Sequence, residues 1–131
     1  MTRPTSLLLP AALALIPGLG TSAHAETGIM TAESSIGEVL TDAHGMTLYV
    51  FDKDVAGSGK STCNGPCATN WPPLMAAAGS QAGGGYSVVM RDDGAHQWAY
   101  HGKPLYYWVK DAKPGDRTGD GVNQVWHLAR P

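Results

Sequence analysis

An internal duplication restricts the folds that this chain of 131 residues can adopt. Residues 44–54 read HGMTLYVFDKD and residues 101–111 read HGKPLYYWVKD, so the two segments align without a gap. Self-similarity at a fixed spacing is typical of proteins built from structural repeats. The sequence therefore predicts two related halves, repeat 1 at about residues 36–76 and repeat 2 at about residues 95–129.

A pattern of one tyrosine, a second aromatic residue and one aspartate occurs in both copies. The residues that carry it are Tyr49, Phe51 and Asp54 in repeat 1 and Tyr106, Trp108 and Asp111 in repeat 2. We expect the aromatic side chains to pack in the core or between the repeats, with the phenols hydrogen-bonded. Each aspartate is expected to end a strand and to accept backbone N–H bonds from the turn that follows.

Both copies alternate side chains as β-strands do, and aromatic and β-branched residues favour a pleated surface. Further strands are expected at residues 39–41, 86–91, 97–101 and 124–129. Turn residues predict a hairpin around residues 92–94 and a second hairpin in which 97–101 pairs with 105–109. One short helical turn is expected near residues 66–70. These elements predict an all-β domain, a compact antiparallel barrel or sandwich built from two pseudo-symmetric repeats.

The first 25 residues have the organisation of a secretory signal peptide, with Arg3 before a short apolar run and a cleavage motif that ends at Ala25. Because that run is too short to span a bilayer comfortably, no membrane anchor is expected after cleavage. A flexible N-terminal segment over residues 26–35 and a two-repeat β-domain over residues 36–131 are expected to follow. The product is expected to be soluble, in the periplasm or outside the cell.

The charge of the chain and the residues of one motif argue against two classes of partner, nucleic acids and ATP. A formal net charge of −2 and the lack of a basic patch argue against nucleic-acid binding. Residues 57–62, GSGKST, resemble the end of a phosphate-binding loop, but Asp54 stands where that motif requires glycine. A carboxylate there would repel phosphate, so ATP binding is not expected and residues 57–62 are interpreted as a flexible polar loop.

Cys63 and Cys67 are separated by Asn-Gly-Pro. In an oxidising compartment this pair favours a structural disulfide, which would fix local geometry more than global stability. A redox pair or a soft-metal site is the alternative, because thiolates and imidazoles bind copper. His44 and His101 each precede a glycine and are interpreted as turn residues, although symmetric repeats would also allow them to share a metal near one axis.

No cofactor is predicted, and copper and calcium are the metals left open. Residues 116–121, DRTGDG, place oxygen ligands as a calcium loop does, but His127 stands where that loop requires a bidentate glutamate. A glycine- and aspartate-rich turn between strands is therefore the simpler interpretation.

The repeated Tyr-x-aromatic-x-x-Asp pattern, with CNGPCATNWPPL between its two copies, resembles the bacterial secreted-repeat family. That family is also described as predicted lipoproteins with a Tyr-x4-Asp motif. The resemblance covers nearly all of the chain after residue 25 and implies export, a biochemical role that is uncharacterised and no established catalytic residues. Many members are lipoproteins, but here no cysteine stands directly after the apolar run to carry the lipid, so membrane tethering is not carried over.

These observations predict a non-enzymatic, exported β-repeat protein that acts as a binding or envelope-associated module. Its partner would be an unknown protein or envelope component. The alternative is a periplasmic metal (copper) or thiol-redox handling protein, with Cys63 and Cys67 or His44 and His101 as ligands. A pocket that holds a histidine with an aspartate partner would favour a hydrolase instead.

Overall fold

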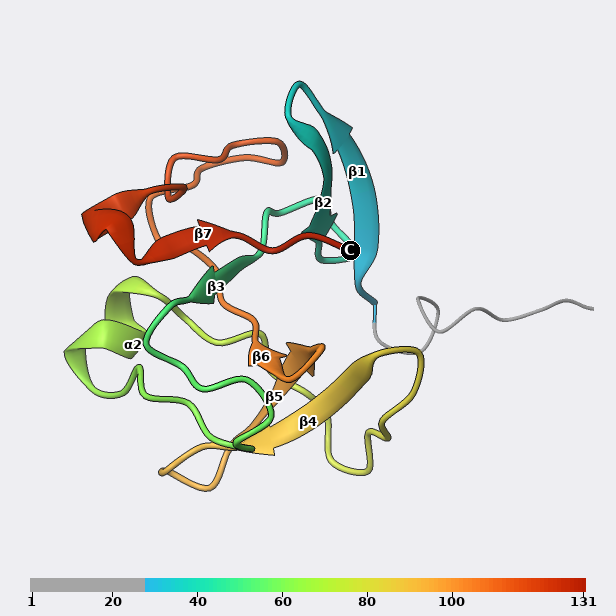
Figure 1. Ribbon diagram of the computed structural model, residues 1–131, viewed down its shortest axis with the longest axis vertical. Coiled ribbons are helices and arrows are strands. Elements are labelled where there is room, and N and C mark those ends of the chain that lie inside the picture. The colour runs from blue at the N-terminus through green and yellow to red at the C-terminus, as the bar shows by residue number, and fades with distance from the viewer. Residues whose placement is uncertain (1–27) are drawn as a thin grey trace, which may run out of the picture.

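The computed structural model describes residues 28–131, so the expected signal peptide over residues 1–25 lies outside the described residues. Short strands joined by long turns dominate the fold (Figure 1). The elements in chain order are β1 (Met30–Ser34), β2 (Gly37–Thr41), β3 (Tyr49–Phe51), α2 (Pro66–Asn70), β4 (Tyr86–Met90), β5 (His96–Tyr100), β6 (Lys103–Pro104), the 3-10 turn η1 (Val122–Gln124) and β7 (Trp126–Leu128).

The N-terminal hairpin corrects one expectation. Residues 30–34, assigned from sequence to a flexible segment, form β1 and pair antiparallel with β2 along its whole length, from Met30 opposite Thr41 to Ser34 opposite Gly37. The preceding Ile29 is fully buried and anchors the start of the hairpin in the core. Backbone pairing and this single apolar anchor thus order a segment whose own side chains are mostly exposed.

The second hairpin has a tighter turn than the sequence predicts. β4 pairs with β5 across residues 91–95, as expected. β5, however, pairs with Lys103 and Pro104, and the Leu105 N–H extends this pairing by donating to the Trp98 carbonyl at 3.0 Å, whereas residues 106–109 do not pair with β5. His101 and Gly102 have φ values of 49° and 81°, the left-handed conformation that two-residue hairpin turns require. This short turn shifts the register and frees the following residues to pair elsewhere.

The two repeats exchange strands at the centre of the molecule. Tyr49 and Tyr106, which are equivalent in the two copies, bond each other reciprocally, with N···O distances of 2.8 and 2.9 Å. Tyr49 also pairs with Leu128 of repeat 2, and Tyr106 pairs with Pro73 of repeat 1. Each tyrosine segment therefore lies beside the tryptophan segment of the other repeat, and a pseudo-twofold axis passes between the two tyrosines.

Three small antiparallel sheets result, with two, two and three strands, and none of them closes into a barrel among the residues described. Two clusters of buried side chains form the core. One contains Ile29, Leu40, Leu48, Leu74, Ala76, Tyr86, Trp98, Leu105 and Ala129. The other contains Val39, Tyr49, Cys63, Trp71, Tyr106, Trp126 and Leu128. Both clusters draw residues from both repeats, so the halves share one interior.

Candidate functional site

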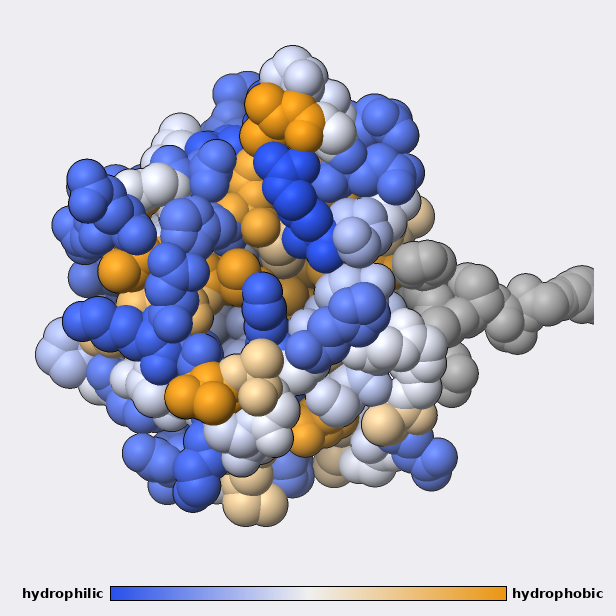
Figure 2. Space-filling view, viewed as in Figure 1, coloured by the Kyte–Doolittle hydropathy of each residue, from blue (hydrophilic) through white to orange (hydrophobic). Residues whose placement is uncertain are grey.

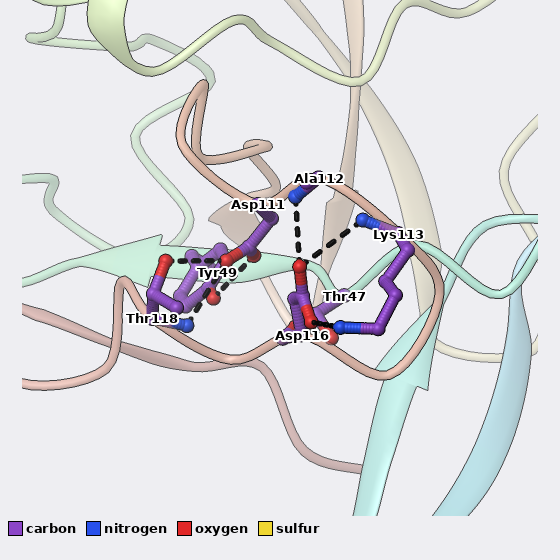
Figure 3. A network of polar contacts seen from close by, with 7 residues as sticks. All are labelled: Thr47, Tyr49, Asp111, Ala112, Lys113, Asp116 and Thr118. Atoms are coloured by element: carbon purple, nitrogen blue, oxygen red, sulfur yellow. Dashed lines mark hydrogen bonds and ion pairs between the residues drawn. The ribbon is translucent and has the colours of Figure 1, made fainter.

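The repeated tyrosine and aspartate form hydrogen bonds between the repeats. The Tyr49 hydroxyl donates to Asp111 Oδ2 at 2.6 Å (Figure 3). The same hydroxyl accepts the Gly119 N–H at 3.1 Å. The other Asp111 oxygen accepts the backbone N–H and the hydroxyl of Thr118, at 2.9 and 2.6 Å. Asp111 thus fixes the turn that follows it and holds a tyrosine of the other repeat.

The pseudo-symmetric equivalent of this arrangement joins Tyr106 to Asp54. The Tyr106 hydroxyl donates to Asp54 Oδ2 at 2.6 Å, and Asp54 Oδ1 accepts the backbone N–H and hydroxyl of Thr62, each at 2.7 Å. Burial raises the pKa of both tyrosines above its ordinary value, and the bonds to Asp111 and Asp54 raise it further. We call these two arrangements the tyrosine latches. They give the repeated motif a structural role in joining the halves.

A buried arginine supports the latch of Tyr106. Arg91 donates from Nη1 to Ser61 Oγ at 3.0 Å and to Gln97 Oε1 at 2.7 Å, and from Nη2 to the Cys63 carbonyl at 2.6 Å. Ser61 Oγ in turn lies 2.7 Å from the Tyr106 hydroxyl. The end of the loop over residues 57–62, expected to be flexible, is therefore fixed, because Ser61 and Thr62 are both bonded to the core.

The two remaining motif residues, Phe51 and Trp108, belong to a stack of four aromatic rings. Trp71 and Trp126 lie at its centre with ring centroids 3.8 Å apart, and Phe51 and Trp108 cover its two ends at 4.2 and 4.0 Å. The order of the rings is symmetric about the same pseudo-twofold axis. These contacts are core packing between the repeats, as the sequence predicts.

Cys63 and Cys67 form a disulfide across the start of α2. As a disulfide, neither sulfur is available as a thiolate ligand. Within residues 28–131 no three His, Cys, Asp or Glu side chains are grouped so as to hold a metal ion. The copper alternative therefore gains no support from the cysteines and stays a prediction.

The two candidate histidines lie in different surroundings. His44 occupies the exposed turn that the Asp42 carboxylate fixes by accepting its N–H at 2.8 Å. His101 is exposed and stacks on Tyr100, with ring centroids 4.0 Å apart. Tyr49 and Tyr106, rather than these histidines, lie at the pseudo-twofold axis.

The oxygens of the calcium-like segment serve separate local contacts. Asp116 accepts the N–H groups of Ala112 and Lys113 and pairs with the Lys113 ammonium at 2.9 Å, and these bonds lower its pKa (Figure 3). Thr118 belongs to a tyrosine latch, and Asp120 Oδ1 accepts the Leu128 N–H at 3.3 Å. Calcium binding at this segment stays a prediction without a preformed ligand set.

A cleft of about 350 Å³ opens where the two repeats meet, and we call it the interrepeat cleft. Apolar atoms are visible at the centre of this face, between hydrophilic groups, where β3, β6 and β7 come together (Figure 2). Its lining residues are Val50, Asp52, Tyr100, His101, Lys103, Leu105, His127, Leu128, Ala129 and Arg130. Among them, His101 is the one candidate metal ligand predicted from the sequence.

The cleft lies where the pseudo-symmetry is broken. Val50 is equivalent to Tyr107 in the alignment of the repeats. Tyr107 extends to Asp42 of the other repeat and donates to its carboxylate at 2.7 Å, and burial followed by this bond raises the pKa of Tyr107. Valine is much smaller than tyrosine, so the corresponding place in repeat 1 stays open. The mismatch at this aligned position is the sequence signal from which the cleft could have been anticipated.

A histidine and an aspartate face each other in the cleft. His127 Nε2 lies 2.8 Å from Asp52 Oδ2, and their side chains are 46% and 52% exposed. This is the pairing that would favour a hydrolase, and the lining includes no serine, threonine or cysteine beside it. The hydrolase alternative stays a prediction.

Comparison with known proteins identifies the repeats. A family model described as a secreted repeat of unknown function matches the chain twice, over residues 30–75 and 87–130. The first match begins at the first residue of β1 and the second within β4, so each repeat includes a hairpin that the sequence boundaries 36–76 and 95–129 partly left out. No curated protein and no solved structure matches the chain. No helix in the described part is long and apolar enough to cross a membrane.

Proposed function

Because this chain belongs to the family of secreted repeats of unknown function, with two copies of the repeat, we propose that it is a non-enzymatic binding module that holds a ligand in the interrepeat cleft. We further propose that it acts in the periplasm or outside the cell after cleavage near Ala25. The observation that carries the proposal is the loss of symmetry at Val50. The latch tyrosines and aspartates are identical in both copies, whereas Val50 stands where repeat 2 has Tyr107 and borders an open space.

The surroundings of the cleft support a recognition role. The latches, the ring stack and the disulfide hold the two repeats rigidly together, and the cleft between the repeats combines apolar residues with several polar and charged side chains that could orient a ligand. His101 lies in the turn after β5 and Lys103 follows that turn as the first residue of β6, and both side chains are exposed. Exposed, chemically varied side chains on a turn held by a rigid scaffold are typical of binding surfaces.

A substitution that restores the symmetry tests the proposal. Val50→Tyr places in repeat 1 the residue that repeat 2 has at Tyr107, and it is expected to fill the cleft while the protein stays folded. Thermal unfolding would be followed for both proteins across a library of small molecules and envelope fragments. Compounds that bind the native state raise the Tm of the wild type, and Val50→Tyr is expected to abolish that rise. A library that stabilises neither protein, or both equally, would contradict the proposal.

A further inference from the structure

We infer that the interrepeat cleft recognises an oxyanion, a carboxylate or phosphate group, carried on a small apolar body. The inference rests on the proposed function and deepens it by naming the class of ligand. Its basis is the charge of the lining. Lys103 and Arg130 carry permanent positive charge, and Asp52 is the single acidic residue among the lining residues.

Lys103 supplies an uncommitted cation at the rim. It lies in β6 directly after the turn formed by His101 and Gly102, and its side chain is exposed. Its ammonium group forms no ion pair within residues 28–131. The neighbouring His101 ring is held in place by its stacking on Tyr100. The turn therefore presents a positive charge and an imidazole together at one side of the cleft.

Arg130 supplies the second cation, at the side of the cleft next to the turn between β1 and β2. Its Nη1 donates to the Ile36 carbonyl in the turn between β1 and β2 at 2.7 Å, which fixes the position of the guanidinium. The other N–H groups of this side chain form no hydrogen bond in the described part of the chain. A guanidinium has five N–H donors in a planar arrangement that matches carboxylate and phosphate oxygens. The fixed position reduces the side-chain entropy lost when an oxyanion binds.

The acidic residue of the cleft is compensated, and the floor is apolar. Asp52 faces His127 at 2.8 Å, so its carboxylate already has a hydrogen-bonding partner. Leu105, Leu128 and Ala129 are buried beneath the opening. The apolar surface that stays open to water belongs to the half-buried Val50 and Tyr100, so an apolar body would cover these side chains and gain about 25 cal/mol for each Å² removed from water.

The test uses three probes of one shape that differ in charge: hexanoate, hexyl phosphate and the neutral hexanamide. Each would be titrated into the isotopically labelled protein, and dissociation constants would be taken from NMR shifts of cleft residues. We expect one or both anions to bind at least tenfold more tightly than hexanamide, and added salt to weaken them. The stronger of the two anions distinguishes a carboxylate ligand from a phosphate ligand.

Variants assign the effect to the cleft. Lys103→Gln is expected to weaken binding of the anions by roughly two- to fivefold, the upper part of the range for one exposed charge contact. Lys113→Gln, which removes an exposed lysine outside the cleft, is expected to change affinity by less than about twofold. Val50→Tyr is expected to abolish the shifts.

Three results would overturn the inference: hexanamide binding as tightly as the anions, no effect of Lys103→Gln, or no shift of cleft signals with any probe. These results differ from failure of the proposed function. If library compounds that are neutral or cationic stabilise the wild type but not Val50→Tyr, the cleft binds ligands and only the charge assignment is wrong.

Discussion

Removal of one phenolic hydroxyl at the pseudo-twofold axis should destabilise the whole domain. The substitution Tyr49→Phe keeps the ring and its packing against Trp71, where the centroids lie 5.4 Å apart, but deletes the hydroxyl. Two hydrogen bonds are lost together. Asp111 loses a donor at 2.6 Å, and the buried Gly119 N–H loses its acceptor at 3.1 Å.

The expected cost follows from the chemistry of those two bonds. A hydrogen bond to a charged group contributes about 1.5–3 kcal/mol, and a buried N–H left without an acceptor costs roughly 1 kcal/mol more. We therefore expect the free energy of unfolding to fall by about 2–4 kcal/mol. For a domain of roughly 100 residues this corresponds to a decrease in Tm of roughly 10–30 °C.

Urea unfolding followed by tryptophan fluorescence would measure the change, and Tyr100→Phe is the matched control. Tyr100 is half-buried, and its hydroxyl forms no hydrogen bond within residues 28–131. Its removal is therefore expected to cost less than about 0.5 kcal/mol. A double-mutant cycle of Tyr49→Phe with Asp111→Asn should give a coupling energy of about 1–3 kcal/mol.

Two results would refute this reasoning. One is a loss of stability in Tyr49→Phe no larger than that in Tyr100→Phe. The other is a coupling energy near zero, which would show that Tyr49 and Asp111 act independently. A change in the slope of ΔG against urea concentration would instead show that the denatured state had altered, so the slope would be compared for every variant.

Further predictions concern pH, packing and connectivity. The pKa values of Tyr49 and Tyr106 are raised in the folded state, so the unfolded chain loses these protons at lower pH than the folded protein does. The free energy of unfolding should therefore fall as pH rises above about 10, by about 1.4 kcal/mol per pH unit for each tyrosine. Urea titrations at increasing pH would check this, and a constant free energy of unfolding would contradict it. A Cβ at Gly119 would lie 2.9 Å from Trp108, Trp71 and Tyr49, so Gly119→Ala should cost roughly 1–3 kcal/mol in the same assay, and a neutral effect would contradict this packing. Proteolytic cleavage within residues 77–85 should leave the two pieces associated on gel filtration, because both core clusters span the repeats; separation of the pieces would show that the repeats fold independently.

The positions of the strands could be predicted from the sequence more accurately than the way the strands pair with one another. Alternating aromatic residues located the strands, and the gapless alignment identified Tyr49 with Tyr106 and Asp54 with Asp111. An alignment shows which positions are equivalent, however. It does not show whether the aspartate that bonds each tyrosine comes from the same repeat or from the other one. The exchange of tyrosine and aspartate between the repeats depends on the long-range pairing of β3 with β7, which no local pattern encodes.

Two other features escaped prediction for physical reasons. β1 has a mostly exposed surface and therefore lacks the apolar alternation that marks a half-buried strand. The interrepeat cleft brings Val50, Lys103 and Arg130 together from three distant parts of the chain. The one sequence signal of the cleft is that Val50 and Tyr107 differ at an aligned position. A search for similar segments does not detect such a difference.

The reciprocal latches have a consequence for the origin of the fold. A chain that carried a single repeat would present a tyrosine and an aspartate that could not reach each other, and a strand without its neighbour. Two such chains would satisfy both needs as a homodimer with an exact twofold axis. The present chain then corresponds to a fused dimer, in which gene duplication made assembly independent of protein concentration. Fusion also allows the two halves to differ, so that one carries Tyr107 at the interface where the other carries Val50.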